Sequence, residues 1–253
     1  MMDERMGPIV VGVDRSDESR AAWEYAAEEA AARVTPLIVV HAVTGNGIGD
    51  DIVAEAVGTA RAQHPALAVT GYAATGDPVR VLSVASAEAG LLVVGHRRRE
   101  PGGGRTAASV ARRLVGAGPV PLLVHRPLDR TGEVTLPRPV LVGIDPAGGA
   151  DALARFAFTE AALRGTPLRV IWVGATGHAE NGASDAVQRW SQKYPDVAVS
   201  TTPWCGVDAW GALATASRSA QLAIVGTTGR PVSEWAARAL VDRAGCPVAV
   251  ITL

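Results

Sequence analysis

The stretch "PIVVGVDRSDESRAAWEYAAEEAAAR" at residues 8–33 decides the fold. Its first seven residues form an apolar run that ends in an aspartate, a pattern typical of a strand buried on both faces of a parallel sheet. From residue 17 onward the apolar and alanine positions follow a helical period, with Ser16 or Asp17 available as the N-cap. A buried strand followed directly by an amphipathic helix predicts the first βα unit of a parallel sheet.

The same alternation continues along the first half of the chain. Further strands are predicted at 36–43, 67–73, 91–95 and 121–127, and further helices at 50–64, 77–89 and 105–118. This order predicts an α/β fold, a doubly wound parallel sheet of five strands with helices on both faces. Ligands bind such sheets beyond the carboxyl ends of the strands. The positions that lie there are Asp14, Ala42, Gly76, Gly95 and the loop 96–108.

The chain contains this pattern twice. "PIVVGVD" (8–14) matches "PVLVGID" (139–145), "GLLVVGHRRR" (90–99) matches "QLAIVGTTGR" (221–230), and "GPVPLLVHRP" (118–127) matches "GCPVAVITL" (245–253). The second-half strands are predicted at 139–145, 168–173, 197–202, 222–226 and 247–252. We therefore predict two tandem domains, residues 1–128 and 139–253, joined by a polar linker at 129–138.

Composition excludes several classes of protein. The 253 residues are 48% hydrophobic and 19% charged, which is a globular balance. A net charge of −1 argues against a nucleic-acid partner, because counterion release needs a basic excess. The chain has no apolar run of membrane-spanning length and no signal-peptide core, so no membrane partner and a cytoplasmic location are expected. Two cysteines are too few for a disulfide framework or a zinc site, and no metal site is expected.

Three blocks carry a resemblance to a known family: "VVGVDRSDESRAAWEYAAEEA", "TGDPVRVL" and "LLVVGHRRR…SVARRLVGAGPVPLLV". With them the chain resembles the universal stress proteins, as a tandem pair that covers nearly its whole length. The resemblance implies a Rossmann-like fold of the adenine nucleotide alpha-hydrolase type, a role in stress response and no enzymatic activity. Nucleotide-binding members carry an Asp at the end of the first strand and G-x2-G-x9-G-[ST] after the fourth. Small residues there let backbone N–H groups approach phosphates at a helix N-terminus.

Mapped onto the first half, the resemblance implies a site for ATP with Mg²⁺ formed by Gly12, Val13, Asp14, Ala42, Gly95, Arg98, Ser109 and Val110. Arg98 and Ala108 stand where the family motif has glycines, although the spacing is preserved. The Arg98 side chain would either block the phosphates or pair with them through its guanidinium. The surrounding arginines (97, 99, 105, 112 and 113) form either a phosphate clamp or a solvated loop.

The second half departs further from the motif. Gly226, Gly229 and Asp145 match, but the loop is shorter, and Glu234 and Trp235 fall where the Gly-Ser pair belongs. Because a carboxylate repels an anion, we expect this half not to bind a triphosphate. Five of the six tryptophans lie in this half, either filling an alanine-rich core or forming a face for protein partners.

Two function hypotheses follow. The first is a universal stress protein with regulatory ATP or adenine-nucleotide binding in its N-terminal domain. The alternative is a nucleotide-independent interaction or scaffold module with unknown protein partners. An ATPase lacks a positioned base or a metal-binding carboxylate pair beyond Asp14, so no catalytic residue is assigned.

The apolar fifth strands at 121–126 and 247–252 would invite pairing if they lay at sheet edges. We predict that they face each other and make the chain an intramolecular pseudo-dimer. The chain would then be a monomer of that form or assemble as a homodimer.

Overall fold

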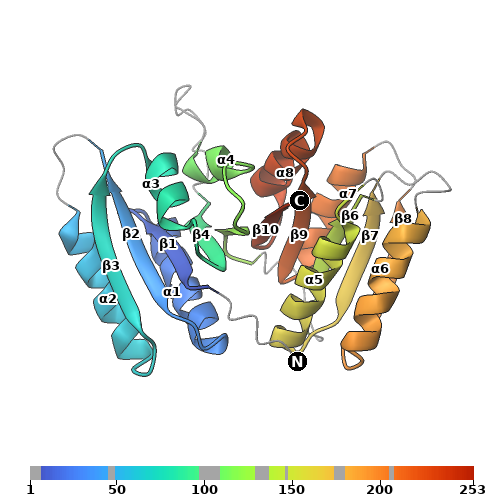
Figure 1. Ribbon diagram of the computed structural model, residues 1–253, viewed down its shortest axis with the longest axis horizontal. Helices are drawn as coiled ribbons and strands as arrows, with labels where there is room; N and C mark the ends of the chain where they lie inside the picture. The colour runs from blue at the N-terminus through green and yellow to red at the C-terminus, as the bar shows by residue number, and fades with distance from the viewer. Residues whose placement is uncertain are drawn as a thin grey trace. The chain divides into compact units, whose positions relative to one another are not determined.

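The computed structural model describes residues 7–44, 49–96, 109–128, 137–145, 148–173, 180–204 and 208–253. The chain divides into two compact units, Met1–Arg126 (unit 1) and Pro127–Leu253 (unit 2). Each unit contains a parallel sheet with helices on both faces, so the predicted α/β class is confirmed (Figure 1).

Unit 1 has the strand order β3-β2-β1-β4-β5. Its strands are β1 (Ile9–Val13), β2 (Leu37–Val43), β3 (Val69–Thr75), β4 (Leu91–Gly95) and β5 (Leu122–His125). Ile9 of β1 pairs in register with Leu37 of β2 and with Leu91 of β4. The chain thus moves outward from β1 to β3 and returns to the other side of β1. The topological switch point, where such sheets bind ligands, lies between β1 and β4.

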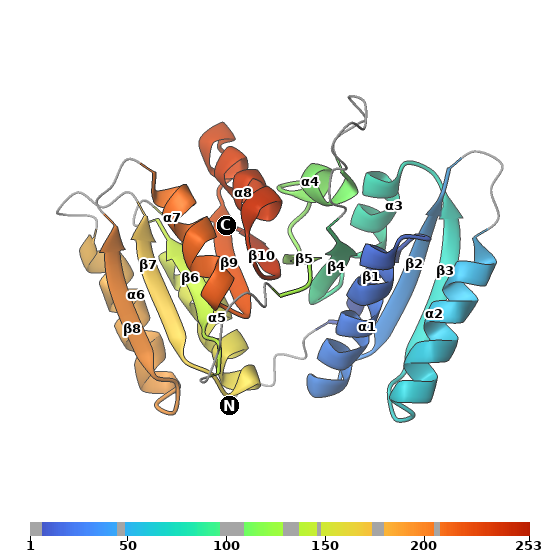
Figure 2. The ribbon, with the colours of Figure 1, turned by 180° about the vertical axis from the view of Figure 1, so that it is seen from behind.

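The helices of unit 1 follow from this order. They are α1 (Asp17–Ala32), α2 (Asp50–Gln63), α3 (Pro78–Ala85) and α4 (Val110–Leu114). Right-handed crossovers place α1 and α2 on one face of the sheet and α3 and α4 on the other, as Figure 2 shows from behind. Ser16, one of the two caps that the sequence offers, caps α1, and Asp77 caps α3 with Pro78 in its first turn.

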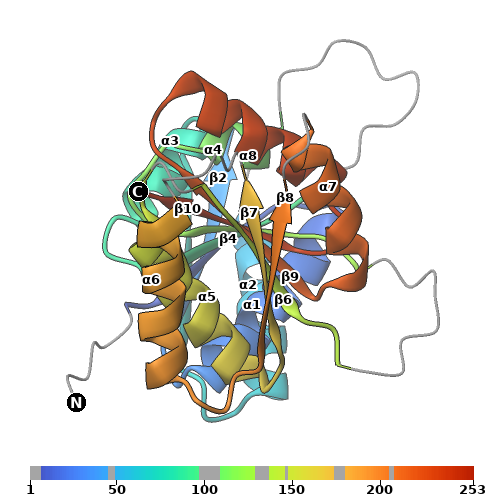
Figure 3. The same ribbon diagram turned by 90° about the vertical axis from the view of Figure 1, so that its right-hand side faces the viewer.

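Unit 2 repeats the arrangement with the order β10-β9-β6-β7-β8. Its strands are β6 (Val140–Ile144), β7 (Leu168–Val173), β8 (Val199–Trp204), β9 (Leu222–Thr227) and β10 (Val248–Thr252). Its helices are α5 (Ala150–Arg164), α6 (Glu180–Lys193), α7 (Ala209–Ala216) and α8 (Pro231–Arg243), with a 3₁₀ turn at Ser217–Ser219. Figure 3 shows α5 and α6 on the opposite side of these strands from α7 and α8.

The sequence repeat is also a repeat of packing. A Cβ on Gly12 of β1 would lie 2.8 Å from Cδ1 of Leu82 on α3. A Cβ on Gly143 of β6 would lie 2.8 Å from Cδ2 of Leu213 on α7. In each unit a glycine in the first strand therefore lets the third helix approach the sheet closely, and the two pairs stand at the same offset in the sequence.

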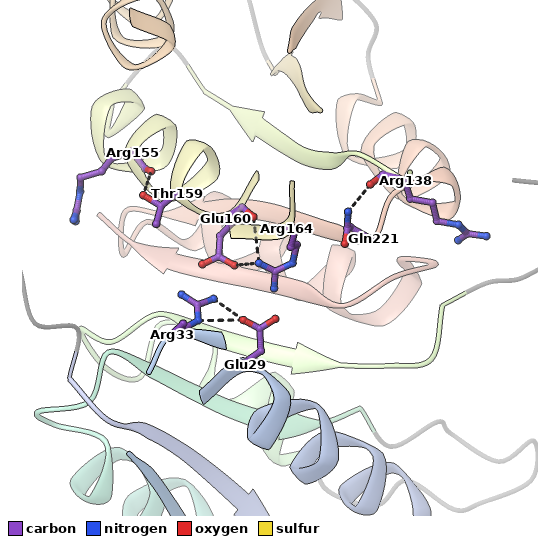
Figure 4. Close-up of polar contacts among 8 residues, drawn as sticks. All are labelled: Glu29, Arg33, Arg138, Arg155, Thr159, Glu160, Arg164 and Gln221. Atoms are coloured by element: carbon purple, nitrogen blue, oxygen red, sulfur yellow. Dashed lines mark hydrogen bonds and ion pairs between the residues drawn. The ribbon is translucent and has the colours of Figure 1, made fainter. Parts of the chain in front are cut away.

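Each unit also holds a buried ion pair at the end of its first helix (Figure 4). Arg33 Nη2 lies 2.7 Å from Glu29 Oε2 in α1, and Arg164 Nη1 lies 2.5 Å from Glu160 Oε2 in α5. No side chain of the four is more than 11% exposed. A buried charge without a partner is strongly destabilising, so each pair constrains its helix end. Figure 4 also shows two backbone carbonyls as acceptors, that of Arg155 from Thr159 and that of Arg138 from Gln221.

Several element ends differ from the sequence prediction. The third strand begins at Val69 instead of residue 67, because Leu67 N donates to His64 O and closes a turn. Helix α3 ends at Ala85 instead of residue 89, because Ala87 and Ala89 form tighter turn bonds. Of the helix predicted at 105–118, the structure shows Val110–Leu114, and residues 105–108 lie outside the described ranges. The pairing of residues 121–126 with 247–252 stays a prediction.

Candidate functional site

The carboxyl edge of unit 1 contains several of the residues that the resemblance singles out. Gly12 and Val13 end β1 and Asp14 follows them, Ala42 lies near the end of β2, and Gly95 ends β4. Ser109 and Val110 begin α4, the next helix after β4. Arg98 falls within residues 97–108, which lie outside the described part of the chain.

Asp14 is exposed and held in a defined turn. Its Oδ1 accepts from the Ser16 backbone N–H at 2.8 Å and from the Ser16 hydroxyl. Its own backbone N–H donates to Ser19 Oγ at 2.8 Å. Aspartates favour such turns because the short carboxylate reaches the backbone two residues on. The turn therefore fixes a carboxylate, which can only accept hydrogen bonds, at the switch point of the sheet.

His41 links strands β1 and β2 at this edge. Its Nδ1 lies 2.7 Å from the Val13 carbonyl oxygen on the neighbouring strand. A carbonyl only accepts, so Nδ1 carries the proton in this contact. The imidazole also packs against Gly49, where a Cβ would collide with the ring. These contacts make His41 a structural histidine of this edge.

Close packing requires a glycine at position 95, and the sequence does not reveal this requirement. A Cβ at this position would lie 2.5 Å from the Glu18 carbonyl oxygen and 2.7 Å from its carbon. Both atoms belong to the backbone of α1, which cannot give way as a side chain can. The first turn of α1 therefore requires a glycine at the end of β4, whether or not a phosphate binds nearby.

Ser109 is the N-cap of α4. Its Oγ accepts from the Arg112 backbone N–H at 3.3 Å. A hydroxyl that accepts one hydrogen bond still has its own proton to donate. Ser109 therefore keeps a donor at the start of the helix that follows β4.

The Arg113 guanidinium forms an ion pair with the N-cap of a neighbouring helix. Its Nη2 lies 2.8 Å from Asp77 Oδ2, while Oδ1 of Asp77 accepts from the backbone of Val79 and Arg80. The Arg113 guanidinium holds the pKa of Asp77 below its usual range. Arg113 thus ties α4 to the N-cap of α3, and its charge is matched locally. Arginines 97, 98, 99 and 105 lie outside the described residues.

A cavity of about 180 Å³ lies beside Asp14 on the α1–α2 side of unit 1. It is lined by Asp14, Arg15, Ser16, Asp17, Ser19, Arg20, Trp23, Ile52 and Glu55. Sequence reasoning missed it because its walls come from two helices whose facing side chains no local pattern reveals. The presence of Trp23 on an otherwise alanine-rich helix was the one available signal.

The corresponding edge of unit 2 is closed by its own residues. Ser233 Oγ accepts from the Thr228 N–H at 3.1 Å and donates to the Arg230 carbonyl at 2.9 Å. The side chain of Leu253 packs where a Cβ on Gly226 would otherwise point. The Ser233 hydroxyl, which follows the short loop after β9, is therefore already engaged in hydrogen bonds to the backbone of that loop.

Within the described residues, no cluster of three or more His, Cys, Asp and Glu side chains is arranged to hold a metal ion. The helices in the described ranges are all too short or too polar to cross a membrane.

Unit 1 is thus a doubly wound α/β unit with polar residues at its switch point, the place where sheets of this class bind ligands. The universal stress protein family matches residues 6–68. A universal stress protein of Mycobacterium tuberculosis is 31% identical over 258 residues, which cover 88% of this chain and 87% of that protein. A second one from the same organism is 29% identical over 273 residues, covering 96% and 95% of the two chains.

The fold agrees with a solved structure. A universal stress protein from Archaeoglobus fulgidus matches with a TM-score of 0.71 and 19% identity, over 98% of this chain and 99% of that one. The chain belongs to the universal stress protein family.

Proposed function

We propose that unit 1 binds an adenine nucleotide, ATP, as a regulatory ligand at its carboxyl edge. The observation that supports the proposal is that the Asp14 carboxylate follows β1 and the Ser109 hydroxyl caps α4, the helix that follows β4, because β1 and β4 flank the switch point. A carboxylate accepts from the exocyclic amino group of adenine, and a hydroxyl donates to a phosphate. The two groups thus have the chemistry that the two ends of a nucleotide require.

The other residues of the site shape it. Val13 ends β1 next to Asp14, Ala42 lies near the end of the neighbouring strand β2, and Gly12 lets α3 approach the sheet closely. Mg²⁺ would arrive with the nucleotide and be held chiefly by phosphate oxygens, as is usual for this ion. In this proposal the Arg98 guanidinium pairs with a phosphate. No residue is assigned a catalytic role.

Unit 2 does not take part in this proposal. Its loop after β9 is tied by Ser233, and Glu234 contacts Arg238 at 2.9 Å. An incoming triphosphate would have to break these contacts and approach a carboxylate. We therefore expect one nucleotide per chain.

Calorimetric titration of Mg-ATP into the purified chain, freed of copurified nucleotide, tests the proposal. Binding should saturate near one per chain, and Asp14→Asn should weaken it by about tenfold or more, the effect of losing a hydrogen bond to a charged group. Asp145→Asn is the matched control, because Asp145 occupies the same position in unit 2 and is also exposed. Equal affinities for the two variants, or no binding at millimolar ATP, would contradict the proposal.

A nucleotide-independent interaction module is the second candidate. The observation that favours it is an exposed apolar pair on α8, Val232 at 75% and Trp235 at 58% exposure. The double substitution Arg98→Gly and Ala108→Gly separates the two candidates. If it creates ATP binding that the wild type lacks, the site is closed in this chain and the interaction module is favoured.

A further inference from the structure

Strand β3 ends the sheet of unit 1 and has a strand neighbour on one side alone, β2. Leu37 N donates to Ala68 O at 2.9 Å, and Gly76 N donates to Val43 O at 3.0 Å. In a parallel pair alternate residues point their backbone groups toward the neighbouring strand. These two bonds therefore show that the backbone N–H and C=O groups of residues 69, 71, 73 and 75 point away from β2.

An arginine of α2 covers one end of this outward row. Arg61 Nη2 donates to the Val69 carbonyl oxygen at 2.7 Å. In the described part of the chain, the outward N–H and C=O groups of Gly71, Ala73 and Thr75 have no hydrogen-bond partner. An edge of this kind is a template for a further strand.

The equivalent edge strand of unit 2 is blocked where β3 is open. Pro203 of β8 pairs with Trp172 of β7, just as Ala73 of β3 pairs with His41 of β2. The backbone alternation is the same, so residue 203 also faces outward. Proline has no N–H, and it is one of the devices that protect edge strands from pairing. The seven residues of β3, VTGYAAT, include neither a proline nor a charged side chain.

The outward row of β3 is complementary to itself. When two copies of the strand run antiparallel about a two-fold axis at Tyr72, Gly71 of each copy lies opposite Ala73 of the other. Both residues point their backbone groups outward, so each such pair exchanges two hydrogen bonds. Tyr72 then lies opposite the same residue of the second copy, with the Cα atoms about 4.5 Å apart. No charged residue of β3 meets a like charge.

The Tyr72 side chain is placed to join this contact. A Cβ on Gly71 would lie 2.7 Å from Cγ1 of Val53, so residue 71 faces α2. Successive residues of a strand face opposite sides of the sheet, and Tyr72 therefore faces the side away from α2. It is 47% exposed. Aromatic pairs directly opposite each other stabilise antiparallel strands.

We propose that β3 pairs antiparallel with β3 of a second copy and that this chain forms a homodimer through that edge. A second copy brings a strand that β2 already holds in place, whereas a disordered peptide would lose conformational entropy on binding to the same short row. The edge also has no charge with which to select a foreign peptide. The contact is isologous, as in most homodimers, and does not depend on nucleotide binding.

Sedimentation of the purified chain over micromolar to millimolar concentrations provides the first test. The wild type should show a reversible monomer–dimer equilibrium. Ala73→Pro gives β3 the protection that Pro203 gives β8, and should weaken the dimer by about tenfold or more, because it removes an outward donor from each copy. Thr201→Pro is the matched control, because residue 201 is an outward position of β8, and it should leave the equilibrium unchanged. A wild type that stays monomeric, with the edge then free for an extended peptide, or a dimer that Ala73→Pro does not weaken, would overturn the proposal.

A charge exchange at the two-fold axis identifies the contact itself. Tyr72→Glu and Tyr72→Lys each place like charges opposite each other, so each variant alone should dimerise more weakly than the wild type. An equimolar mixture of the two variants should associate more tightly than either alone, because opposite charges then meet. A mixture that associates no better than its components would show that the two chains do not meet at Tyr72, and the proposal would be wrong.

Discussion

Val34 occupies a backbone conformation that suits glycine. Its φ is +52°, in the left-handed region, and it follows the C-terminus of α1. The N–H of Val34 donates to Ala31 O at 3.2 Å and that of Thr35 to Ala30 O at 3.0 Å, which are the two bonds of a Schellman motif. Unit 2 ends α5 with the same two bonds, but with Gly165 at φ +59° in the equivalent position.

The expected effect of Val34→Gly follows from this geometry. An L-residue with a Cβ loses about 1–2 kcal/mol in the left-handed region, and a β-branched side chain is especially unfavourable there. The Val34 side chain is 92% exposed, so its removal sacrifices almost no burial. Glycine in turn raises the entropy of the unfolded chain, which opposes the gain by roughly 0.5–1 kcal/mol. We therefore expect Val34→Gly to stabilise unit 1 by about 0.5–1 kcal/mol.

Urea unfolding followed by the indole N–H NMR resonance of Trp23 measures this change in unit 1 alone, because Trp23 is the only tryptophan before residue 127. The midpoint should rise with an unchanged m-value. Gly165→Val is the matched control and should destabilise unit 2 by a similar or larger amount. A Val34→Gly chain that is no more stable than the wild type would refute the strain argument.

Three further predictions concern stability. Burial lowers the pKa of His125 to about 4 from 6.5. Because the unfolded chain takes up this proton first, the free energy of unfolding should fall as the pH drops from about 6.5 toward 4, by at most about 3 kcal/mol. His125→Phe should remove that slope in urea titrations at pH 7 and pH 5. Gly95→Ala should cost roughly 2 kcal/mol without any nucleotide, since the added Cβ meets backbone. Gly58→Ala, in the open middle of α2, should instead stabilise by about 0.5–1 kcal/mol in the same urea titration. Glu29→Gln should cost about 3 kcal/mol because it leaves a buried guanidinium without its carboxylate, whereas Glu55→Gln, in an exposed pair, should change chemical stability by less than about 1 kcal/mol.

The sequence by itself determined the α/β class, the existence of most strands and the starts of helices α1 and α3. Each of these features depends on contiguous residues, such as the apolar run that ends at Asp14 or the Asp77–Pro78 pair at the start of α3. The repeat was equally visible, because it needs only a comparison of short blocks. The placement of Asp14 and Gly95 at one edge also followed, since the carboxyl ends of parallel strands in one sheet lie on the same side.

The tertiary structure alone decided what several of these residues do. Gly95 meets the backbone of Glu18, Arg113 pairs with Asp77, and Trp23 lines a cavity shared with α2. These contacts join residues that are tens of positions apart, so no local period or spacing encodes them. The strained φ of Val34 could not be predicted from the sequence either. A glycine commonly follows a helix C-terminus, but here the two hydrogen bonds to the last turn of α1 impose the left-handed conformation on a valine, which disfavours it.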